Sequence, residues 1–354
     1  MGQEQDIFPR LPAPLLAWYD THARVLPWRG NPAPYRVWIS EIMLQQTRIE
    51  AVIPYYRRFL AELPDVAALA ACEDDRLMKL WQGLGYYSRA RNLKAAAGKI
   101  LSDFGGVLPR EPEKLMTLPG IGAYTAGAIA SIAYGMPAPA VDGNVLRVLT
   151  RVLASPEDIA AEKTKKRFTD LLCEAYPTGE DARMLTEGLM ELGETVCIPN
   201  GDAKCDLCPL ADLCRANRGK ITDLFPVKTP KKPRRIEEYT VLLLECDGTF
   251  AVVRRPAGGL LAGLYLFPML DGFRSEDEIA ALYPRARTVA ALPEGKHIFT
   301  HIEWHMRGFA VRLDTRPEGM LFVTPEDLSA RYAVPTAHRH FERLLQDRRK
   351  GTAK

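Results

Sequence analysis

The chain has 354 residues, of which 47% are hydrophobic and 26% are charged, the composition of a soluble globular protein with room for two domains. Its net charge of +3 favours an anionic partner only mildly. No run approaches the roughly 18 apolar residues that cross a membrane, so we expect no membrane span.

The N-terminal segment MGQEQDIFPR has neither a basic stretch nor an apolar one, and so lacks the form of a secretory signal. We therefore expect a reducing, cytoplasmic compartment. The seven cysteines agree with a reducing compartment, because an odd number fits a disulfide framework poorly. Cys72, Cys173 and Cys246 stand alone in the sequence, where cysteine ordinarily serves packing.

Residues 1–225 predict a mainly helical domain, because apolar residues recur there at three- and four-residue steps between prolines. The clearest helices are expected over residues 67–80, 88–104 and 163–176. Residues 226–236 follow as a linker, since PVKTPKKPRR holds five basic residues and three prolines. Such a segment is expected to be extended, solvated and within reach of phosphates.

After the linker the apolar period changes to that of strands, and we expect a smaller α+β domain over residues 237–354. Residues 239–245 and 249–255 are rich in β-forming residues and flank Cys246-Asp247-Gly248, a hairpin signal. Residues 296–313 also predict strand, with a turn near Thr300–His301.

A glycine-rich turn precedes a run of small residues in LPGIGAYTAGAIASIAYG, which begins at Leu118. Gly120 and Gly122 allow positive φ and a close approach of the backbone to a ligand. The run from Ala123 to Ala133 predicts a helix, whose unpaired N-terminal amides suit an anion such as phosphate. A Gly-x-Gly pair is weak support by itself, because most such pairs are ordinary loop turns.

Four cysteines crowd into one short stretch with the spacing C-x7-C-x2-C-x5-C: Cys197, Cys205, Cys208 and Cys214. Thiolates so placed can hold a [4Fe–4S] cluster or a zinc ion. Zinc sites more often contain two C-x2-C pairs, and this stretch has one, which favours the cluster over zinc or no metal. No open coordination position is implied, so we expect a structural role that braces a loop rich in lysine and arginine.

Two carboxylates stand in contrasting surroundings. Glu41 lies among Ile39, Ile42 and Met43 on a predicted helix, and apolar surroundings raise a carboxyl pKa toward that of a general acid near neutrality. Asp142, in AVDGNVLRVLTR, lies at a predicted helix N-terminus that should keep it ionised. Opposite pKa shifts of this kind indicate that one carboxyl group acts as an acid and the other as an anion. A surface glutamate and a simple aspartate N-cap are the competing interpretations.

LPGIGAYTA, VDGNVLRV and the four-cysteine stretch resemble the helix–hairpin–helix DNA glycosylase superfamily that includes endonuclease III. SEIMLQQTR and GLGYYSRARNL are similar to the MutY-type adenine DNA glycosylases within it. The resemblance spans both domains, from Pro27 to His301. It implies the helix–hairpin–helix glycosylase fold, a [4Fe–4S] cluster, and a hairpin that grips the DNA backbone through Gly120 and Gly122. The implied function is removal of adenine mispaired with 8-oxoguanine or guanine in double-stranded DNA, within base excision repair.

Catalytic roles follow from the same resemblance. Glu41 would protonate adenine, and Asp142 would stabilise the positive charge on the sugar and help water attack. Tyr124 and Asn144 would orient the site. Endonuclease III-like members carry, at the position of Tyr124, a lysine whose amine cuts the strand, so a lyase step is not expected here.

The substrate-binding residues that the resemblance implies would reach the extruded adenine, the helix beside the orphaned base, or the opposite base. They are Trp28, Arg29, Leu44, Gln46, Thr47, Leu84, Tyr86, Glu187, Phe299, Thr300 and His301. Helix packing is the competing interpretation for Trp28, Leu44 and Tyr86.

The C-terminal domain resembles the Nudix-like domain of MutY-type enzymes through GGLLAGLYLFP, but it lacks the acidic REx2EE core of Nudix hydrolases. Binding without hydrolysis is therefore expected. Phe299-Thr300-His301 is similar to the family's Phe-Ser-His loop that reads 8-oxoguanine, and its threonine retains the hydroxyl. His297, His301 and His305 also share one face, which leaves a metal site open, although separated strand histidines are usual.

The cysteine stretch departs from the family pattern, in which six residues separate the first two cysteines, because seven separate Cys197 from Cys205 here. A turn at Asn200-Gly201-Asp202 can accommodate the extra residue, so we expect the cluster to be retained.

Two alternative functions stay open. One is an endonuclease III-like glycosylase and lyase for damaged pyrimidines, which Tyr124 disfavours. The other is a catalytically silent iron–sulfur protein that binds DNA, which the presence of both Glu41 and Asp142 disfavours. We expect a monomer, and the compact chain without targeting tails suggests a bacterial, nucleoid-associated protein.

Overall fold

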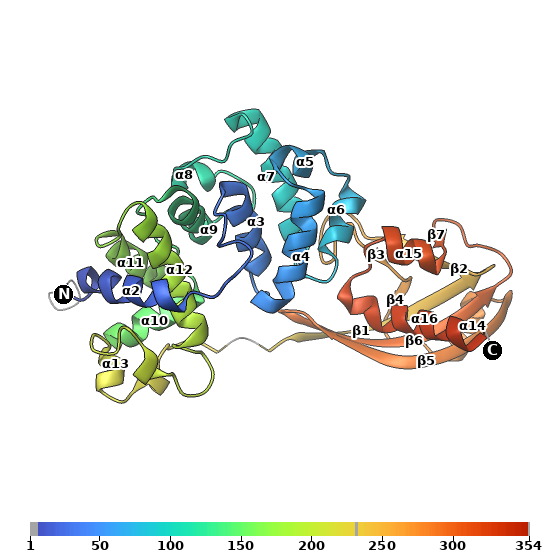
Figure 1. Cartoon of the computed structure of the whole chain (residues 1–354). Helices are drawn as coiled ribbons and strands as arrows, with labels where there is room; N and C mark the ends of the chain where they lie inside the picture. The colour runs from blue at the N-terminus through green and yellow to red at the C-terminus, as the bar shows by residue number, and fades with distance from the viewer. Residues whose placement is uncertain (1–5, 231–232, 353–354) are drawn as a thin grey trace. The chain divides into compact units, whose positions relative to one another are not determined.

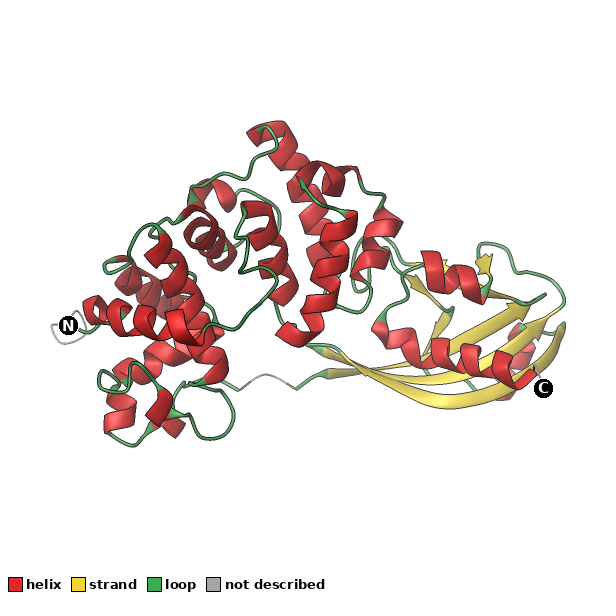
Figure 2. Ribbon diagram, viewed as in Figure 1, coloured by secondary structure: helices red, strands yellow, loops and turns green. Residues whose placement is uncertain are grey.

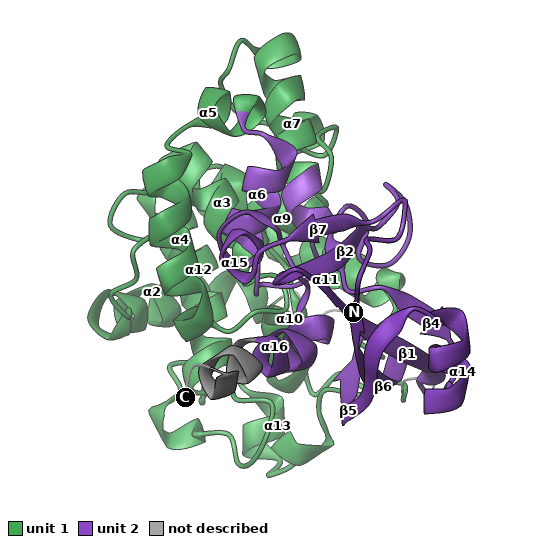
Figure 3. Ribbon diagram, turned by 90° about the vertical axis from the view of Figure 1, so that its right-hand side faces the viewer, with its two compact units in different colours: residues 1–71, 92–230 green, residues 72–91, 231–354 purple. Residues whose placement is uncertain are grey.

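The chain folds into two compact units, coloured separately in Figure 3: residues 1–71 with 92–230, and residues 72–91 with 231–354. The computed structural model describes residues 6–230 and 233–352, with the backbone alone for 346–352. In the described residues the first unit is helical and the strands all lie in the second (Figures 1 and 2). The predicted fold class, a helical region followed by a smaller α+β region, is confirmed.

The first unit is built from helices joined by short turns. Its elements are η1 (Phe8–Arg10), α2 (Pro12–His22), α3 (Pro34–Leu44), α4 (Ile49–Glu62), α5 (Val66–Ala71), most of α7 (Ser88–Phe104), α8 (Pro112–Leu115), α9 (Ala123–Ala128), the π-helical turn η2 (Ile129–Ala133), α10 (Gly143–Leu153), α11 (Glu162–Cys173), α12 (Glu180–Thr195), η3 (Cys205–Leu207), α13 (Arg215–Arg218) and η4 (Thr222–Leu224).

Three helix predictions can be compared with these bounds. The helix over residues 88–104 is confirmed as α7. The single helix over residues 67–80 is wrong, because Glu73 takes extended backbone and separates α5 from α6 (Asp74–Trp81). The third helix, α11, ends at Cys173 and not at residue 176, since a helix ends before the residue that precedes a proline, here Pro177.

The core of the first unit forms where α2, α10, α11 and α12 pack together. α10 is buried along its whole length from Val145 to Leu153, so it needs cover on every side. Leu185, Leu189 and Leu192 supply part of it from one face of α12, because residues three or four apart share a helix face. This packing fixes α10, whose N-cap is Asp142, and α12, which carries Glu187 and Glu191.

The second unit contains a sheet with the strand order β3-β2-β1-β6-β5, to which β4 adds at β1 and β7 at β2. β1 and β6 pair in parallel, and β5 and β6 form an antiparallel hairpin. The strands are β1 (Arg235–Cys246), β2 (Thr249–Arg254), β3 (Tyr265–Leu266), β4 (Met269–Asp271), β5 (Ala286–Ile298), β6 (Ile302–Leu313) and β7 (Leu321–Val323), and the accompanying helices are α6, α14 (Glu276–Leu282), α15 (Pro325–Arg331), η5 (Thr336–His338) and α16 (Arg339–Thr352).

The strand predictions agree with this sheet. β1 contains the strand expected over residues 239–245, and β2 covers the strand expected over 249–255 except for its last residue. Asp247 and Gly248 both take positive φ in the turn between them. The strand expected over residues 296–313 is the end of β5 followed by β6, with the turn at residues 299–301. The expected turn near Thr300–His301 is therefore confirmed.

Residues 72–91 group with the second unit, whereas the sequence-based boundary places them in the domain over 1–225. Side-chain bonds to the C-terminal backbone account for the grouping. Lys79 Nζ donates to the carbonyl of Tyr332 (3.0 Å), and Gln82 Nε2 donates to that of Val334 (2.9 Å). The Tyr265 hydroxyl in turn donates to Asp75 (3.0 Å). Such contacts between distant segments carry no signal in the local sequence.

Two hydrogen bonds to residues 158 and 159 fix the start of the linker predicted over residues 226–236. The amide of Ile159 donates to the carbonyl of Val227 (3.1 Å), and the Thr229 hydroxyl donates to Asp158. Lys231 and Lys232 lie outside the described residues, and β1 begins at Arg235. No described helix is both long and apolar enough to cross a membrane.

Candidate active site

Glu41 is buried on α3, with 5% of its surface exposed. The neighbouring residues Trp38, Ile39, Ile42 and Met43 are buried too, so the carboxyl has little contact with water. Burial raises the pKa of Glu41 from 4.5 to about 7, while the hydrogen bond from Tyr124 lowers it. The predicted raised pKa is confirmed, and the surface interpretation of Glu41 is wrong.

Tyr124 reaches Glu41 from the first turn of α9. Its hydroxyl donates to Glu41 Oε2 at 2.8 Å, and burial raises its own pKa well above the usual value. The turn before α9 sets this position. Gly120 there has φ of +78°, and a Cβ on it would lie 2.7 Å from the Cβ of Asn92. Gly122 caps α9 with φ of −94°, so only Gly120 uses the left-handed region that both glycines allow.

Asp142 is the N-cap of α10. Its Oδ1 accepts hydrogen bonds from the amides of Asn144 (2.9 Å) and Val145 (2.8 Å). Burial nevertheless raises the pKa of Asp142, because it outweighs the lowering by these two amides. The expectation that the helix start shifts Asp142 opposite to Glu41 is therefore wrong in direction, since the cost of desolvation is not visible in a capping motif.

Asn144 is fixed from two sides. Arg147 Nη2 donates to Asn144 Oδ1 (2.9 Å) and to the carbonyl of Gly193 (2.8 Å). Gly193 allows α12 to approach closely, because a Cβ there would lie 2.9 Å from the Cβ of Asn144. Side chains of α10 and the backbone of α12 thus hold the Asp142–Asn144 turn.

One cavity of about 370 Å³ joins these groups, within the roughly 300–1,000 Å³ typical of small-molecule pockets. It brings together ten of the residues singled out from the sequence: Trp28, Arg29, Glu41, Leu44, Gln46, Thr47, Tyr124, Asp142, Asn144 and Glu187. Trp28 also packs edge-on against Tyr56, with ring centroids 5.4 Å apart, so it serves the core as well.

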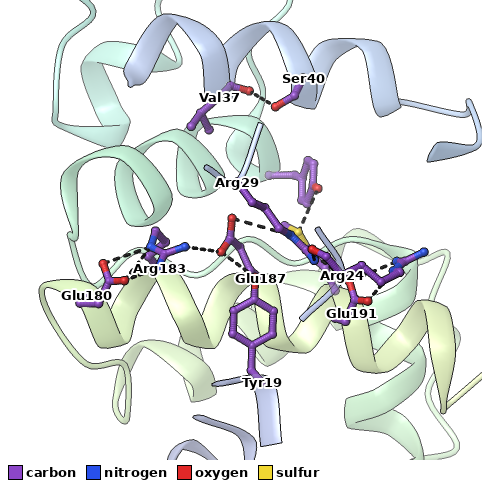
Figure 4. Close-up of polar contacts among 11 residues, drawn as sticks. Tyr19, Arg24, Arg29, Val37, Ser40, Glu180, Arg183, Glu187 and Glu191 are labelled. Carbon is purple, nitrogen blue, oxygen red and sulfur yellow. Dashed lines mark hydrogen bonds and ion pairs between the residues drawn. The ribbon is translucent and has the colours of Figure 1, made fainter. Parts of the chain in front are cut away.

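Glu187 and Glu191 accept hydrogen bonds from arginine side chains in and near this pocket (Figure 4). Glu187 Oε2 accepts from the Tyr19 hydroxyl and from Arg183 Nη1, both at 2.8 Å. Burial raises the pKa of Glu187, while these donors lower it. Glu191 accepts from Arg29 Nη2 (2.7 Å) and from Arg24 through both carboxylate oxygens.

Glu191 and Arg24 are pocket residues that the sequence analysis missed. Glu191 lies four residues after Glu187 on α12, so both carboxylates share one helix face, and this spacing is a signal that could have found it. Arg24 lies in a loop after α2, and nothing in its local sequence sets it apart.

The remaining residues predicted to bind the substrate lie in the second unit. Leu84 is buried, which agrees with a packing role, while Tyr86 is 45% exposed. The Tyr86 hydroxyl and Thr300 Oγ1 lie 2.6 Å apart, so the structure brings Tyr86 to the loop at Phe299–His301. Tyr86 has φ of 45° and Gln46, in the first unit, has φ of 58°, a conformation that few non-glycine residues adopt.

The four cysteines at 197–214 line one small cavity in the first unit. Arg151 Nη1 donates to Cys197 Sγ at 3.2 Å, and Arg147 Nε donates to the Cys197 carbonyl at 2.8 Å. The residues between Cys197 and Cys205 form an exposed turn with Gly201 at φ of 77°, closed by a bond from Lys204 N to Val196 O at 3.0 Å. The chain bends at residues 199–201, where the turn at Asn200-Gly201-Asp202 was predicted.

No group of three or more His, Cys, Asp or Glu side chains in the described part of the chain is arranged to hold a single metal ion. The alternative of a metal site at His297, His301 and His305 thus finds no support. His305 Nε2 instead lies 2.7 Å from Glu303 Oε1. His297 packs against Phe299, with ring centroids 4.5 Å apart.

Comparison with known proteins gives the class first. Residues 39–174 match the HhH-GPD superfamily of base excision DNA repair proteins, and residues 239–343 match the NUDIX domain. A solved structure of a thermostable thymine-DNA glycosylase is 27% identical, with a TM-score of 0.55 over 62% of this chain and 98% of that chain. The helical unit therefore belongs to the class of base excision DNA repair proteins.

Two relatives specify the family. The adenine DNA glycosylase of Mus musculus is 35% identical over 96% of this chain and 78% of its own length. The adenine DNA glycosylase of Buchnera aphidicola from Acyrthosiphon pisum is 31% identical over 84% of this chain and 85% of its own length. The chain belongs to the adenine DNA glycosylase family. It is a DNA-binding enzyme of base excision repair that excises adenine.

Replacing Glu191 by glutamine tests the arginine arrangement at the pocket. The change leaves Arg24 and Arg29 facing a neutral amide, so Arg29 loses its fixed position. We expect adenine excision in single turnover to fall at least tenfold, and the free energy of unfolding to fall by about 3 kcal/mol, because one partner of a buried ion pair is lost.

The matched control is Glu162→Gln, which removes an exposed ion pair with Lys165 on α11. Urea unfolding should show a change below about 1 kcal/mol for this control, with unaltered excision. Equal behaviour of the two variants would contradict a role for Glu191 at the pocket.

Proposed function

We propose that this enzyme is a monofunctional glycosylase that removes adenine paired with 8-oxoguanine or with guanine, and that it works as a monomer. The observation that carries the proposal is the hydrogen-bonded pair of Glu41 and Tyr124 beside Asp142 in one pocket. Residues of a single chain line this pocket, so no second copy is needed to complete it.

Glu41 is the proton donor in this proposal. With its pKa raised to about 7, much of the carboxyl is protonated near neutral pH. Tyr124 donates to Oε2, which leaves Oε1 to carry the proton toward a ring nitrogen of adenine. The N-glycosidic bond then breaks with its electron pair moving to the protonated base, which departs as neutral adenine.

Asp142 stabilises the sugar. Bond cleavage leaves an oxocarbenium-like cation, whose charge favours the ionised form of Asp142 and so opposes the effect of burial. Two amides fix Oδ1, which leaves Oδ2 to face the sugar. Water adds to the anomeric carbon, either directly or after a transient bond to Asp142, and its proton goes to the Glu41 carboxylate, which lost one to adenine.

Tyr124 accounts for the absence of strand cleavage. A lyase needs an amine that forms a Schiff base with the opened sugar, and a tyrosine hydroxyl bonded to Glu41 cannot supply one. Trp28, Arg29, Leu44, Thr47 and Glu187 are assigned to adenine, because they line the cavity that contains Glu41.

The second unit is assigned to the opposite base. Thr300 and His301 are exposed at the tip of the β5–β6 hairpin, as residues that reach a base must be. The matched NUDIX domain lacks the REx2EE core in this chain, which supports binding without hydrolysis. Gln46 and Tyr86, both exposed and at positive φ, are assigned to the helix beside the orphaned base.

The four cysteines are proposed to hold a [4Fe–4S] cluster. The four thiols line one shared cavity, which supports a single metal group bound by all four. The stretch contains one C-x2-C pair and not the two that are more usual at zinc sites, which favours the cluster over zinc. The bond from Arg151 to Cys197 Sγ supplies positive charge beside a thiolate ligand.

Defined duplexes test the proposed reaction. The protein is incubated with DNA that carries one 8-oxoguanine:adenine, guanine:adenine or thymine glycol:adenine pair, and samples are resolved with and without alkali. We expect breaks at adenine opposite either purine only after alkali. Glu41→Gln should abolish excision yet retain affinity for the 8-oxoguanine:adenine duplex, because it removes the proton but keeps the side-chain shape.

Three outcomes would contradict this proposal. Breaks at the pyrimidine without alkali would identify a lyase. Duplex binding with no abasic product would identify a silent DNA-binding protein. Loss of duplex affinity in Glu41→Gln to the same degree as activity would show that Glu41 is structural.

Metal analysis tests the cluster. We expect about four iron and four sulfide per chain in anaerobically purified protein, and lower content after Cys208→Ser. Cys246→Ser serves as the control, since Cys246 is buried in the second unit and should not alter iron content. One zinc per chain without sulfide would contradict the cluster.

A further inference from the structure

The hairpin loop at Phe299–His301 lies beside a fixed group of side chains in its own unit. The strand register creates this group. Trp304 on β6 lies opposite Glu237 on parallel β1 and opposite His297 on antiparallel β5. Residues directly opposite in register project from the same face of a sheet, so these three side chains are neighbours.

Hydrogen bonds hold the indole of Trp304 in place. Trp304 is 2% exposed, and its Nε1 donates to Glu237 Oε2 at 2.9 Å. The Tyr239 hydroxyl donates to the same oxygen at 3.0 Å, and its ring meets Trp304 edge-on with centroids 5.0 Å apart. A buried aromatic ring with a bonded N–H and an aromatic neighbour has little freedom to turn.

Phe299 rests on this group. Its ring meets Trp304 at 70° with centroids 4.9 Å apart, and meets His297 at 75° with centroids 4.5 Å apart. Both are favourable edge-to-face arrangements. Phe299 is thereby half-buried, while Thr300 and His301 remain exposed.

The main chain of the loop is fixed as well. The Phe299 amide donates to the Ile302 carbonyl at 2.8 Å and closes the turn. Arg234 Nε donates to the Phe299 carbonyl, and the Arg235 amide donates to the His301 carbonyl, both at 3.1 Å. The loop is therefore anchored at both ends before any DNA is bound.

We propose that Trp304 and Glu237 are positioning residues for opposite-base discrimination, a role that rests on the proposed function of the Phe299–His301 loop. They keep Phe299 in one place and so present Thr300 and His301 in a single arrangement. A loop that is ordered before binding loses less conformational entropy when DNA binds. Its contacts with the opposite base therefore contribute more fully to the difference in binding free energy between 8-oxoguanine and guanine. Neither residue needs to touch DNA for this effect.

The test measures how strongly the protein prefers 8-oxoguanine over guanine as the opposite base, and not the rate of excision. Dissociation constants are determined for duplexes in which 2′-fluoro-2′-deoxyadenosine, an analogue that resists excision, faces 8-oxoguanine or guanine. Trp304→Leu removes the ring beneath Phe299, and Glu237→Ala removes the acceptor of the indole. Each variant should lower the ratio of the dissociation constant for the guanine duplex to that for the 8-oxoguanine duplex about three- to tenfold. Single-turnover excision from guanine:adenine should stay within about twofold of wild type, because the pocket at Glu41 is not altered.

Conservative variants separate positioning from a general loss of structure. Glu237→Gln retains an acceptor for Trp304 Nε1 and should restore most of the discrimination. Glu245→Gln is the matched control, since Glu245 lies opposite Arg312 on the same two strands with the nearest charged atoms 3.8 Å apart. It should leave the ratio unchanged, and thermal unfolding confirms that every variant is folded at the assay temperature.

Phe299→Ala distinguishes failure of this inference from failure of the proposed function. An unchanged ratio in Phe299→Ala would show that the loop does not read the opposite base. A ratio lost in Phe299→Ala but unchanged in Trp304→Leu and Glu237→Ala would overturn the positioning role alone. An equal loss of affinity for both duplexes would overturn it too, because that pattern indicates general destabilisation.

Discussion

The burial of one carboxyl group, that of Glu41, is the constraint around which the pocket is arranged. A pKa raised from 4.5 to about 7 corresponds to about 3 kcal/mol of unfavourable free energy for the charged form. The fold tolerates this group because Tyr124 supplies one hydrogen bond and because the protonated form carries no charge. Burial of Glu41 lowers the stability of the fold as the pH rises from 4.5 to about 7, and it keeps the carboxyl protonated over the same range. Helix α3 thus gives up stability at the position that we propose as the proton donor.

Helix α10 links the pocket to the cysteine stretch. Its N-cap is Asp142, and its next turns carry Arg147 and Arg151, four residues apart and both buried. Arg147 bonds to the Asn144 side chain and to the carbonyl of Cys197, while Arg151 bonds to Cys197 Sγ. The stretch that we assign to a cluster therefore contacts the same rigid helix that presents Asp142. This arrangement agrees with a structural role for the cysteines, since it braces the helix whose N-cap, Asp142, we propose to stabilise the sugar cation.

Features set by local sequence could be predicted, and features set by tertiary burial could not. The small residues after Gly122, the Asp142 cap and the apolar neighbours of Glu41 each signal their conformation within a few positions. The positions of Glu191 and Arg24 at the pocket depend on how α12 meets the loop after α2, which no short motif records. The raised pKa of Asp142 was missed for the same reason, because a capping motif does not reveal how much water the folded chain excludes. The grouping of residues 72–91 with the second unit likewise depends on contacts with residues more than two hundred positions away.

The protonation state of Glu41 in the free protein tests this account most directly. Infrared difference spectroscopy of wild type minus Glu41→Gln isolates the carboxyl stretch of this one residue across a pH series. We predict a protonated band that persists at pH 6 and disappears with a midpoint near 7, because burial raises the pKa of Glu41 to about 7. A midpoint at the ordinary value of 4.5 would contradict the account, since Glu41 would then be ionised at neutral pH and could not donate the proton to adenine.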